Sequence, residues 1–113
     1  MALNIFAGSR ADKETRLLQF VCDANEDTPS RGDVIRMLAD YAWLDADNEI
    51  LFEAIRQLFA QSPRDVLAHL PAELTRRGFP DLPWEPLRGP SRIEPGAALE
   101  LAESLLRKGE TEK

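Results

Sequence analysis

The sequence predicts a mainly α-helical chain with one short strand near its N-terminus. Apolar residues recur at helical spacing in several segments, and helix-capping signatures precede them, while residues 2–7 read as a short strand. We expect the strand to be followed by five or six helices, with a proline-rich connector before the last one. At 113 residues the chain is long enough for one domain with one modest core.

Residues 1–45 carry the best-defined pattern. The short apolar run at residues 2–7 is followed by two predicted helices, and each helix begins with a Ser-x-x-Asp capping signature, at Ser9 and at Ser30. The first helix is expected to run from about Arg10 to Ala24. Because so short a strand is not stable alone, we expect it to pair with a second copy of the chain, which predicts a homodimer.

Residues 46–79 are expected to form a helical extension. Its strongest apolar set lies between residues 50 and 59, and no Gly or Pro separates it from the preceding helix, so one long bent helix is an alternative. A third capping signature starts at Ser62. Pro71 should end the short helix that follows, and a further helix should end at Gly78.

The C-terminal third divides into a connector and a last helix. Residues 80–95 hold five of the eight prolines and predict an extended connector that is not helical. Residues 96–113 predict a final helix, to about Lys108, and a short tail.

One segment resembles a known DNA-binding family. The run Ser30-Arg31-Gly32-Asp33-Val34-Ile35-Arg36-Met37-Leu38 is similar to the start of the second helix in ribbon-helix-helix repressors of bacteria, plasmids and phages. The resemblance covers residues 1–44. In that family two strands pair across a two-fold axis and enter the major groove, while amides at the start of the second helix hold a backbone phosphate. The resemblance therefore implies DNA contacts by six residues: Asn4, Phe6, Arg10, Ser30, Arg31 and Gly32.

A second candidate surface combines arginines, aromatic residues and prolines near the connector. A stiff, extended segment loses little entropy on docking, which favours a protein-binding role. The residues expected to bind a partner are Arg76, Arg77, Trp84, Arg88 and Arg92. The alternative is that Trp84 and Leu87 fold back to close the core.

Charge and composition exclude several classes of function. With 14 basic and 20 acidic residues, the net charge of −6 argues against a broad, non-specific binder of nucleic acid or membranes. Cys22 and His69 are the only residues of their types, so we expect no disulfide, no metal site, no cofactor and no enzymatic activity. The sequence shows no signal peptide and no long apolar run, so we expect a cytoplasmic protein without membrane association.

The leading hypothesis is a small, non-enzymatic regulator that acts as a dimeric, ribbon-helix-helix-like transcriptional repressor or antitoxin. Its C-terminal part would then bind a protein such as a toxin. The alternative is an acidic protein-interaction module that inhibits a basic protein, as a phage or plasmid inhibitor or an immunity protein does, with no nucleic-acid role. Its acidic face would be formed by Asp45, Asp47, Glu49 and Glu53.

Overall fold

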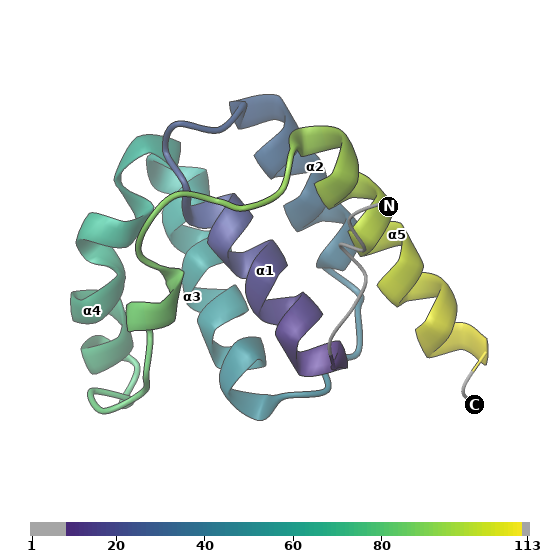
Figure 1. Ribbon diagram of the computed structural model, residues 1–113. Helices are drawn as coiled ribbons and strands as arrows, with labels where there is room; N and C mark the ends of the chain where they lie inside the picture. The colour runs from purple at the N-terminus through teal and green to yellow at the C-terminus, as the bar shows by residue number, and fades with distance from the viewer. Residues whose placement is uncertain (1–8, 112–113) are drawn as a thin grey trace.

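The computed structural model of the protein describes residues 9–111, and every regular element in that range is helical. The five α-helices are α1 (Arg10–Cys22), α2 (Thr28–Leu38), α3 (Ala46–Gln61), α4 (Val66–Arg76) and α5 (Pro95–Thr111). Two 3-10 turns join them: η1 (Pro63–Asp65) leads into α4, and η2 (Glu85–Leu87) lies in the proline-rich connector. Helix α1 lies at the centre, with α2 and α5 on one side and α3 and α4 on the other (Figure 1).

The prediction of a mainly helical chain is confirmed, but the prediction of a ribbon-helix-helix-like N-terminal part is wrong. Among residues 9–111 there is no strand, and the expected strand at residues 2–7 lies outside the described residues. Helices α1 and α2 do not form a separate unit that needs a second copy, because α3 and α5 of the same chain cover them. The apolar faces of α1 and α2 are thus covered within one chain.

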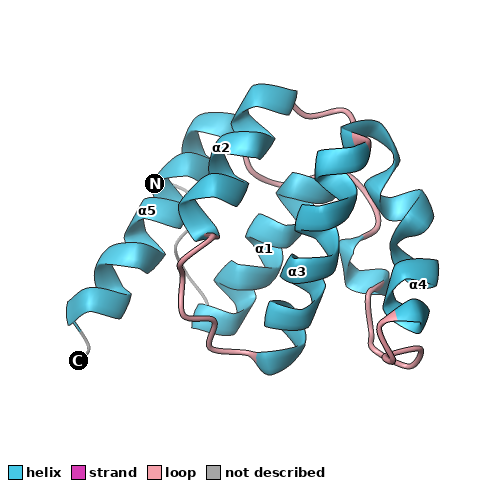
Figure 2. Cartoon of the chain, turned by 180° about the vertical axis from the view of Figure 1, so that it is seen from behind, coloured by secondary structure: helices cyan, strands magenta, loops and turns pink. Residues whose placement is uncertain are grey.

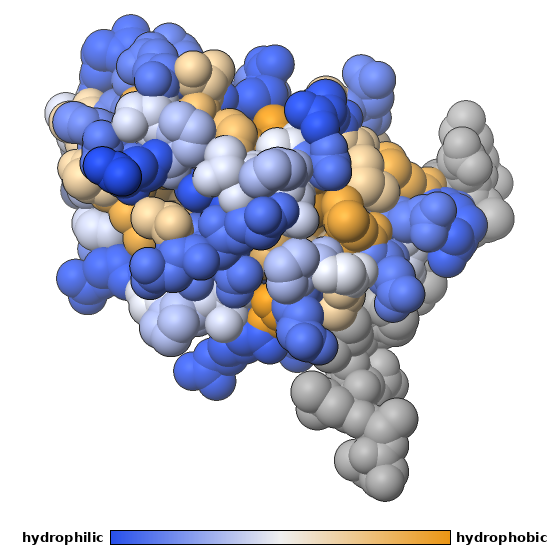
Figure 3. Space-filling model, turned by 90° about the horizontal axis from the view of Figure 1, so that it is seen from above, coloured by the Kyte–Doolittle hydropathy of each residue, from blue (hydrophilic) through white to orange (hydrophobic). Residues whose placement is uncertain are grey.

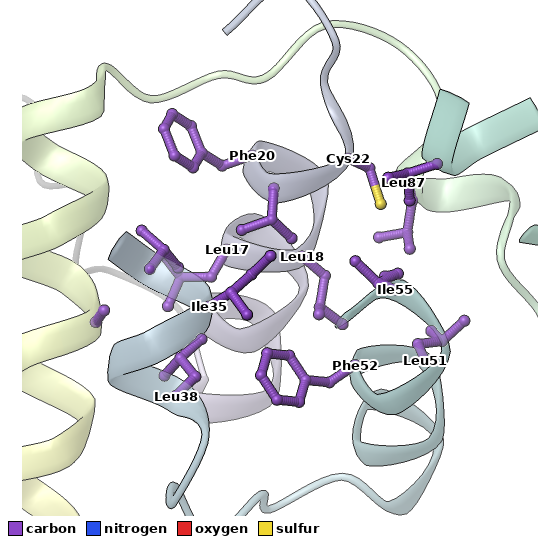
Figure 4. Close-up of a cluster of buried hydrophobic side chains, with 14 of the residues drawn as sticks. Leu17, Leu18, Phe20, Cys22, Ile35, Leu38, Leu51, Phe52, Ile55 and Leu87 are labelled. Carbon is purple, nitrogen blue, oxygen red and sulfur yellow. The ribbon is translucent and has the colours of Figure 1, made fainter. Parts of the chain in front are cut away.

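The hydrophobic core is formed where α1, α2 and α3 face one another. Figure 4 shows Leu17 and Leu18 of α1, Ile35 of α2 and Phe52 of α3 converging between these helices. Leu87 of the connector is also buried in this core. The connector therefore closes one side of the core, and the Gln19 side chain fastens it by donating hydrogen bonds to its backbone carbonyls.

Helix α2 begins two residues before the predicted Ser30 cap. Asp27 is the N-cap, and its carboxylate accepts a hydrogen bond from the Ser30 backbone N–H at 3.0 Å. Pro29 then occupies the first turn, where its fixed φ is already helical and its missing N–H is not needed. A loop separates α2 from α3, so the alternative of one long bent helix is excluded (Figure 2).

Pro71 does not end a helix as predicted, because α4 runs through it from Val66 to Arg76. Val66, Leu70 and Leu74 lie one turn apart on the same face of α4 and are all buried. We infer that this shared burial outweighs the hydrogen bond that the proline removes. The connector also differs from the extended chain expected, since η2 gives it one helical turn.

The upper surface of the molecule offers little apolar area. Among the coloured atoms of Figure 3, hydrophilic side chains predominate and apolar atoms lie in small islands between them. In the part of the chain that the structure describes, no helix combines the length and the apolar character needed to cross a bilayer.

Candidate functional site

The phosphate site expected at the start of α2 is filled by the protein's own groups. The Asp27 carboxylate accepts from both the backbone N–H and the hydroxyl of Ser30, at 3.0 and 2.7 Å. A negative charge therefore already occupies the positive end of this helix, where a DNA phosphate was expected. Pro29 offers no N–H in the same turn.

Arg31, the central residue of the expected DNA contact, is a core residue that is only 1% exposed. Its Nε donates to the Val21 carbonyl at 2.9 Å, and Nη2 donates to the Pro63 carbonyl at 2.6 Å. The guanidinium lies over the Phe59 ring, 4.9 Å from its centroid. Burial lowers the pKa of Arg31 from its ordinary value. This arginine ties α1 and η1 to α2 and cannot reach a ligand outside the protein.

The other expected DNA contacts do not form a basic surface with it. Gly32 packs close to the Phe59 ring, and Arg10 is held by Tyr41 and by the Ala42 carbonyl. Asn4 and Phe6 lie outside the described residues.

The arginines of the expected partner-binding surface fall into two groups. Arg76 and Arg77 both donate to the Glu73 carboxylate, and these hydrogen bonds hold the pKa of Glu73 below its ordinary value. Arg88 lies over the ring of Trp84, with its guanidinium carbon 5.6 Å from the ring centroid.

Arg92 is also exposed, on the connector side of the molecule. Trp84 is half-buried against the core, so its ring is a support for Arg88 and only in part a contact surface. Of the five residues, Arg76, Arg77 and Arg88 are thus engaged by neighbouring side chains of the chain itself.

A cleft lies between the first half of α3 and the turn that follows α4. Its volume is about 410 Å³, and its lining residues are Glu49, Ile50, Glu53, Arg77 and Phe79. Ile50 is partly buried and gives the cleft an apolar wall, while Phe79 is 39% exposed on the opposite side. The cleft thus combines apolar and acidic groups at one place.

Local structure fixes Phe79 at this cleft. Gly78 adopts a positive φ of 95°, and its N–H donates to the Thr75 carbonyl at 3.0 Å. The Phe79 N–H donates to the Leu74 carbonyl at 2.8 Å, which completes a Schellman cap at the end of α4. The sequence predicted that a helix ends at this glycine. The cap is confirmed, and the ring is left partly exposed beside α3.

The charged residues that line the cleft differ in whether they already have a partner within the chain. Arg77 is already engaged, because its Nε lies 2.6 Å from a Glu73 oxygen and its Nη2 donates to Gln57. Glu53 forms an exposed pair with Arg56 at 2.6 Å, and such pairs are weak. Glu49 is exposed and has no ion-pair partner within the described residues. The cleft therefore has a negative charge available to a ligand.

The acidic residues within 45–49 at the start of α3 have two roles. Asp45 caps the helix, while Asp47 and Glu49 are exposed to solvent. Asp45 is the N-cap of α3, and its carboxylate accepts from the N–H groups of Asp47 and Asn48 at 2.8 and 3.2 Å. Asp47 and Glu49 are exposed in the first turn of α3, where a carboxylate is also favoured by the helix dipole.

The sequence reasoning missed a buried carboxylate, Glu14, which lies against the loop between α2 and α3. Glu14 of α1 is 0% exposed and accepts four hydrogen bonds. The donors are the Tyr41 hydroxyl and the Leu44 N–H at 2.7 Å, and the Asp45 N–H and the Asn48 amide at 3.2 Å. Burial and the hydrogen bond to Glu14 raise the pKa of Tyr41 to about 12. This network fixes the loop between α2 and α3.

The burial of Glu14 could have been predicted from the sequence. Glu14 precedes Leu17, Leu18 and Val21 by three, four and seven positions, which places it on the inner face of its helix. A charged residue on an apolar stripe is a buried polar group that needs partners, and Glu14 finds four.

No family model, curated protein or solved structure matches the chain. Within residues 9–111 no three His, Cys, Asp or Glu side chains come together in a way that could hold a metal ion.

Proposed function

We propose that this chain is a non-enzymatic protein-interaction module whose acidic cleft binds, and thereby blocks, a basic surface of another protein. The observation that carries this proposal is the composition of the cleft, in which an exposed Phe79 faces Glu49 across an apolar wall. An apolar side chain of the partner can pack against Phe79, and a lysine or arginine beside it can pair with Glu49. Aromatic anchors in clefts of this kind commonly dominate binding energy.

The net charge supports a basic partner rather than an acidic one. The chain carries a formal charge of −6, so its long-range field attracts positively charged proteins and repels nucleic acid. Glu49 is at the surface, and a charge at the rim of an interface mainly raises the association rate. We expect binding to weaken with added salt, because exposed charges are screened within about 10 Å at 0.1 M salt.

Selection from a display library tests the proposal even though the partner is unidentified. The probe is a small folded scaffold with a randomised surface, selected against the full chain. We expect most independent binders to carry Lys or Arg next to an apolar side chain. Their affinity should fall about tenfold or more with Phe79→Ser, and several-fold with Glu49→Gln.

Glu100→Gln is the matched control, since it removes the same charge from an exposed position on α5. It should leave the affinity of these binders unchanged. The proposal is overturned if most independent binders have no excess of basic residues, or if Phe79→Ser and Glu49→Gln affect them no more than the control does.

A further inference from the structure

Leu44 is the most exposed large hydrophobic residue in the described part of the chain. It is 58% exposed, and Phe79 is the other large hydrophobic side chain that is exposed there. A single exposed leucine is ordinary on a protein surface. Leu44 differs from such a residue in two respects: it directly precedes the N-cap of α3, and its backbone N–H is held by a buried carboxylate.

The loop that carries Leu44 is fixed from beneath by α1. The Glu14 carboxylate accepts the Leu44 N–H at 2.7 Å and the Asp45 N–H at 3.2 Å. Arg10 donates to the Ala42 carbonyl at 2.9 Å and to the Tyr41 hydroxyl at 2.8 Å. Burying a carboxylate is costly, and here four hydrogen bonds compensate for it, three of them from this loop and one from Asn48 of α3.

Neighbouring aromatic rings hold the same loop. Trp43 packs edge-on against Tyr41, with centroids 5.0 Å apart, and lies 4.9 Å from Phe52 of α3. The residues on both sides of Leu44 are thus anchored inward, while Leu44 itself is left at the surface.

Helix geometry places Leu44 beside Glu49, which lines the cleft. Asp45 is the N-cap of α3, so Leu44 stands at the N′ position and Glu49 at N4. These two positions lie side by side, and they usually carry two hydrophobic residues that pack together. Here the N4 residue is a glutamate that also lines the cleft, so Leu44 lacks its usual apolar partner.

The two exposed apolar side chains therefore flank one acidic surface. The loop between α2 and α3 and the turn after α4 both lie at the lower end of the molecule in Figures 1 and 2, with the start of α3 between them. Glu49 belongs to this helix start and lines the cleft together with Phe79.

We propose that Leu44 is a second anchor of the interaction surface, presented by a loop that Glu14 holds in its binding conformation. This inference rests on the proposed function and makes it more specific: the partner is a folded basic surface with an apolar pocket for Leu44 and an apolar side chain that enters the cleft. A loop already ordered before binding loses less entropy in the complex, which raises affinity. Glu14 is a positioning residue in this scheme and does not touch the partner.

The test uses those selected scaffold binders that depend on Phe79. We expect Leu44→Ser to lower their affinity about tenfold, and the control Ala42→Ser, an exposed change in the same loop, to have no effect. Binders that lose affinity with Phe79→Ser but not with Leu44→Ser overturn this inference and leave the proposed function standing. Selected binders that are indifferent to both Phe79 and Glu49 overturn the proposed function itself.

A double-mutant cycle tests the role of Glu14. Glu14→Gln should lower the affinity several-fold in the parent chain and have no further effect in the Leu44→Ser chain, because its influence passes through Leu44. If Glu14→Gln lowered the affinity equally in the parent chain and in the Leu44→Ser chain, Glu14 would have a merely structural role, and this part of the inference would be overturned. Tyr41→Phe removes one donor to Glu14 and serves in the same cycle if Glu14→Gln does not fold.

Discussion

Replacing Glu14 is the most direct test of the buried network. Glu14→Ala leaves the N–H groups of Leu44 and Asp45 without their acceptor, and it also removes the partner of the Tyr41 hydroxyl and the Asn48 amide. An unsatisfied buried donor costs about 1–3 kcal/mol. Since both N–H groups are only partly buried, the lower half of that range applies. From these two N–H groups alone we expect the free energy of unfolding to fall by about 2–4 kcal/mol, a large share of the roughly 5–15 kcal/mol typical of a domain.

Glu14→Gln should be the milder change. It keeps one acceptor oxygen, and Asn48 can turn its amide so that its oxygen accepts from the new glutamine side chain. The Asp45 N–H then lacks a partner, and the Asn48 amide no longer donates to the Ala11 carbonyl, which keeps its hydrogen bond from Thr15. We expect a loss of about 1–2 kcal/mol. Urea unfolding followed by far-ultraviolet circular dichroism measures both values, and Glu100→Gln should stay within about 0.5 kcal/mol of the parent. Parent-like stability of Glu14→Ala would refute this account of the network.

Three further predictions concern buried groups elsewhere in the core. Tyr41 is the only tyrosine, and its ultraviolet titration should show a pKa near 12, raised by burial and by Glu14. Because the folded pKa lies above the unfolded one, this contribution to stability is complete below about pH 10 and is lost as the pH rises toward 12. Burial raises the pKa of Cys22 to about 12, so its alkylation at neutral pH should be slow in the folded protein and fast in denaturant. Arg31→Met should cost about 2–4 kcal/mol, because the buried Val21 carbonyl and the partly buried Pro63 carbonyl lose their donor, whereas Arg64→Met at the surface should be neutral.

Each of these predictions has a clear contrary result. A Tyr41 titration near pH 10 would mean that the hydroxyl is neither buried nor held by Glu14. Alkylation of Cys22 at the same rate in the folded and unfolded protein would place the thiol at the surface. Equal stability of the Arg31 and Arg64 variants would show that Arg31 does not hold η1 to α2.

The helices could be predicted from local signals where those signals were unambiguous. Ser9 forms the complete capping box that its sequence predicts, with Asp12 reaching back to the Ser9 backbone. The start of α2 was misplaced because Asp27 and Ser30 are both good caps three residues apart. The choice between them is made by Pro29, which suits the first turn of a helix that begins after Asp27.

The site could be predicted only in part, because it is built from segments distant in sequence. The acidic residues at the start of α3 and the glycine cap at Gly78 are local features, and both were visible in the sequence. Their meeting at one cleft depends on how α3 packs against α4, which no local pattern encodes. The Leu44 N–H is held by Glu14, thirty positions away, so the placement of this loop is likewise a tertiary property.

Arg31 shows why a motif can match while its function does not. The resemblance to a repressor helix treated Arg31 as an exposed phosphate contact, yet it precedes Val34, Ile35 and Leu38 by three, four and seven positions. That spacing places all four residues on one helix face, and the structure buries all four. Once the guanidinium is committed to the Val21 and Pro63 carbonyls, the motif describes a core contact. Periodicity is therefore the stronger guide here, because it states which face of the helix meets water before any role is assigned to a charged residue.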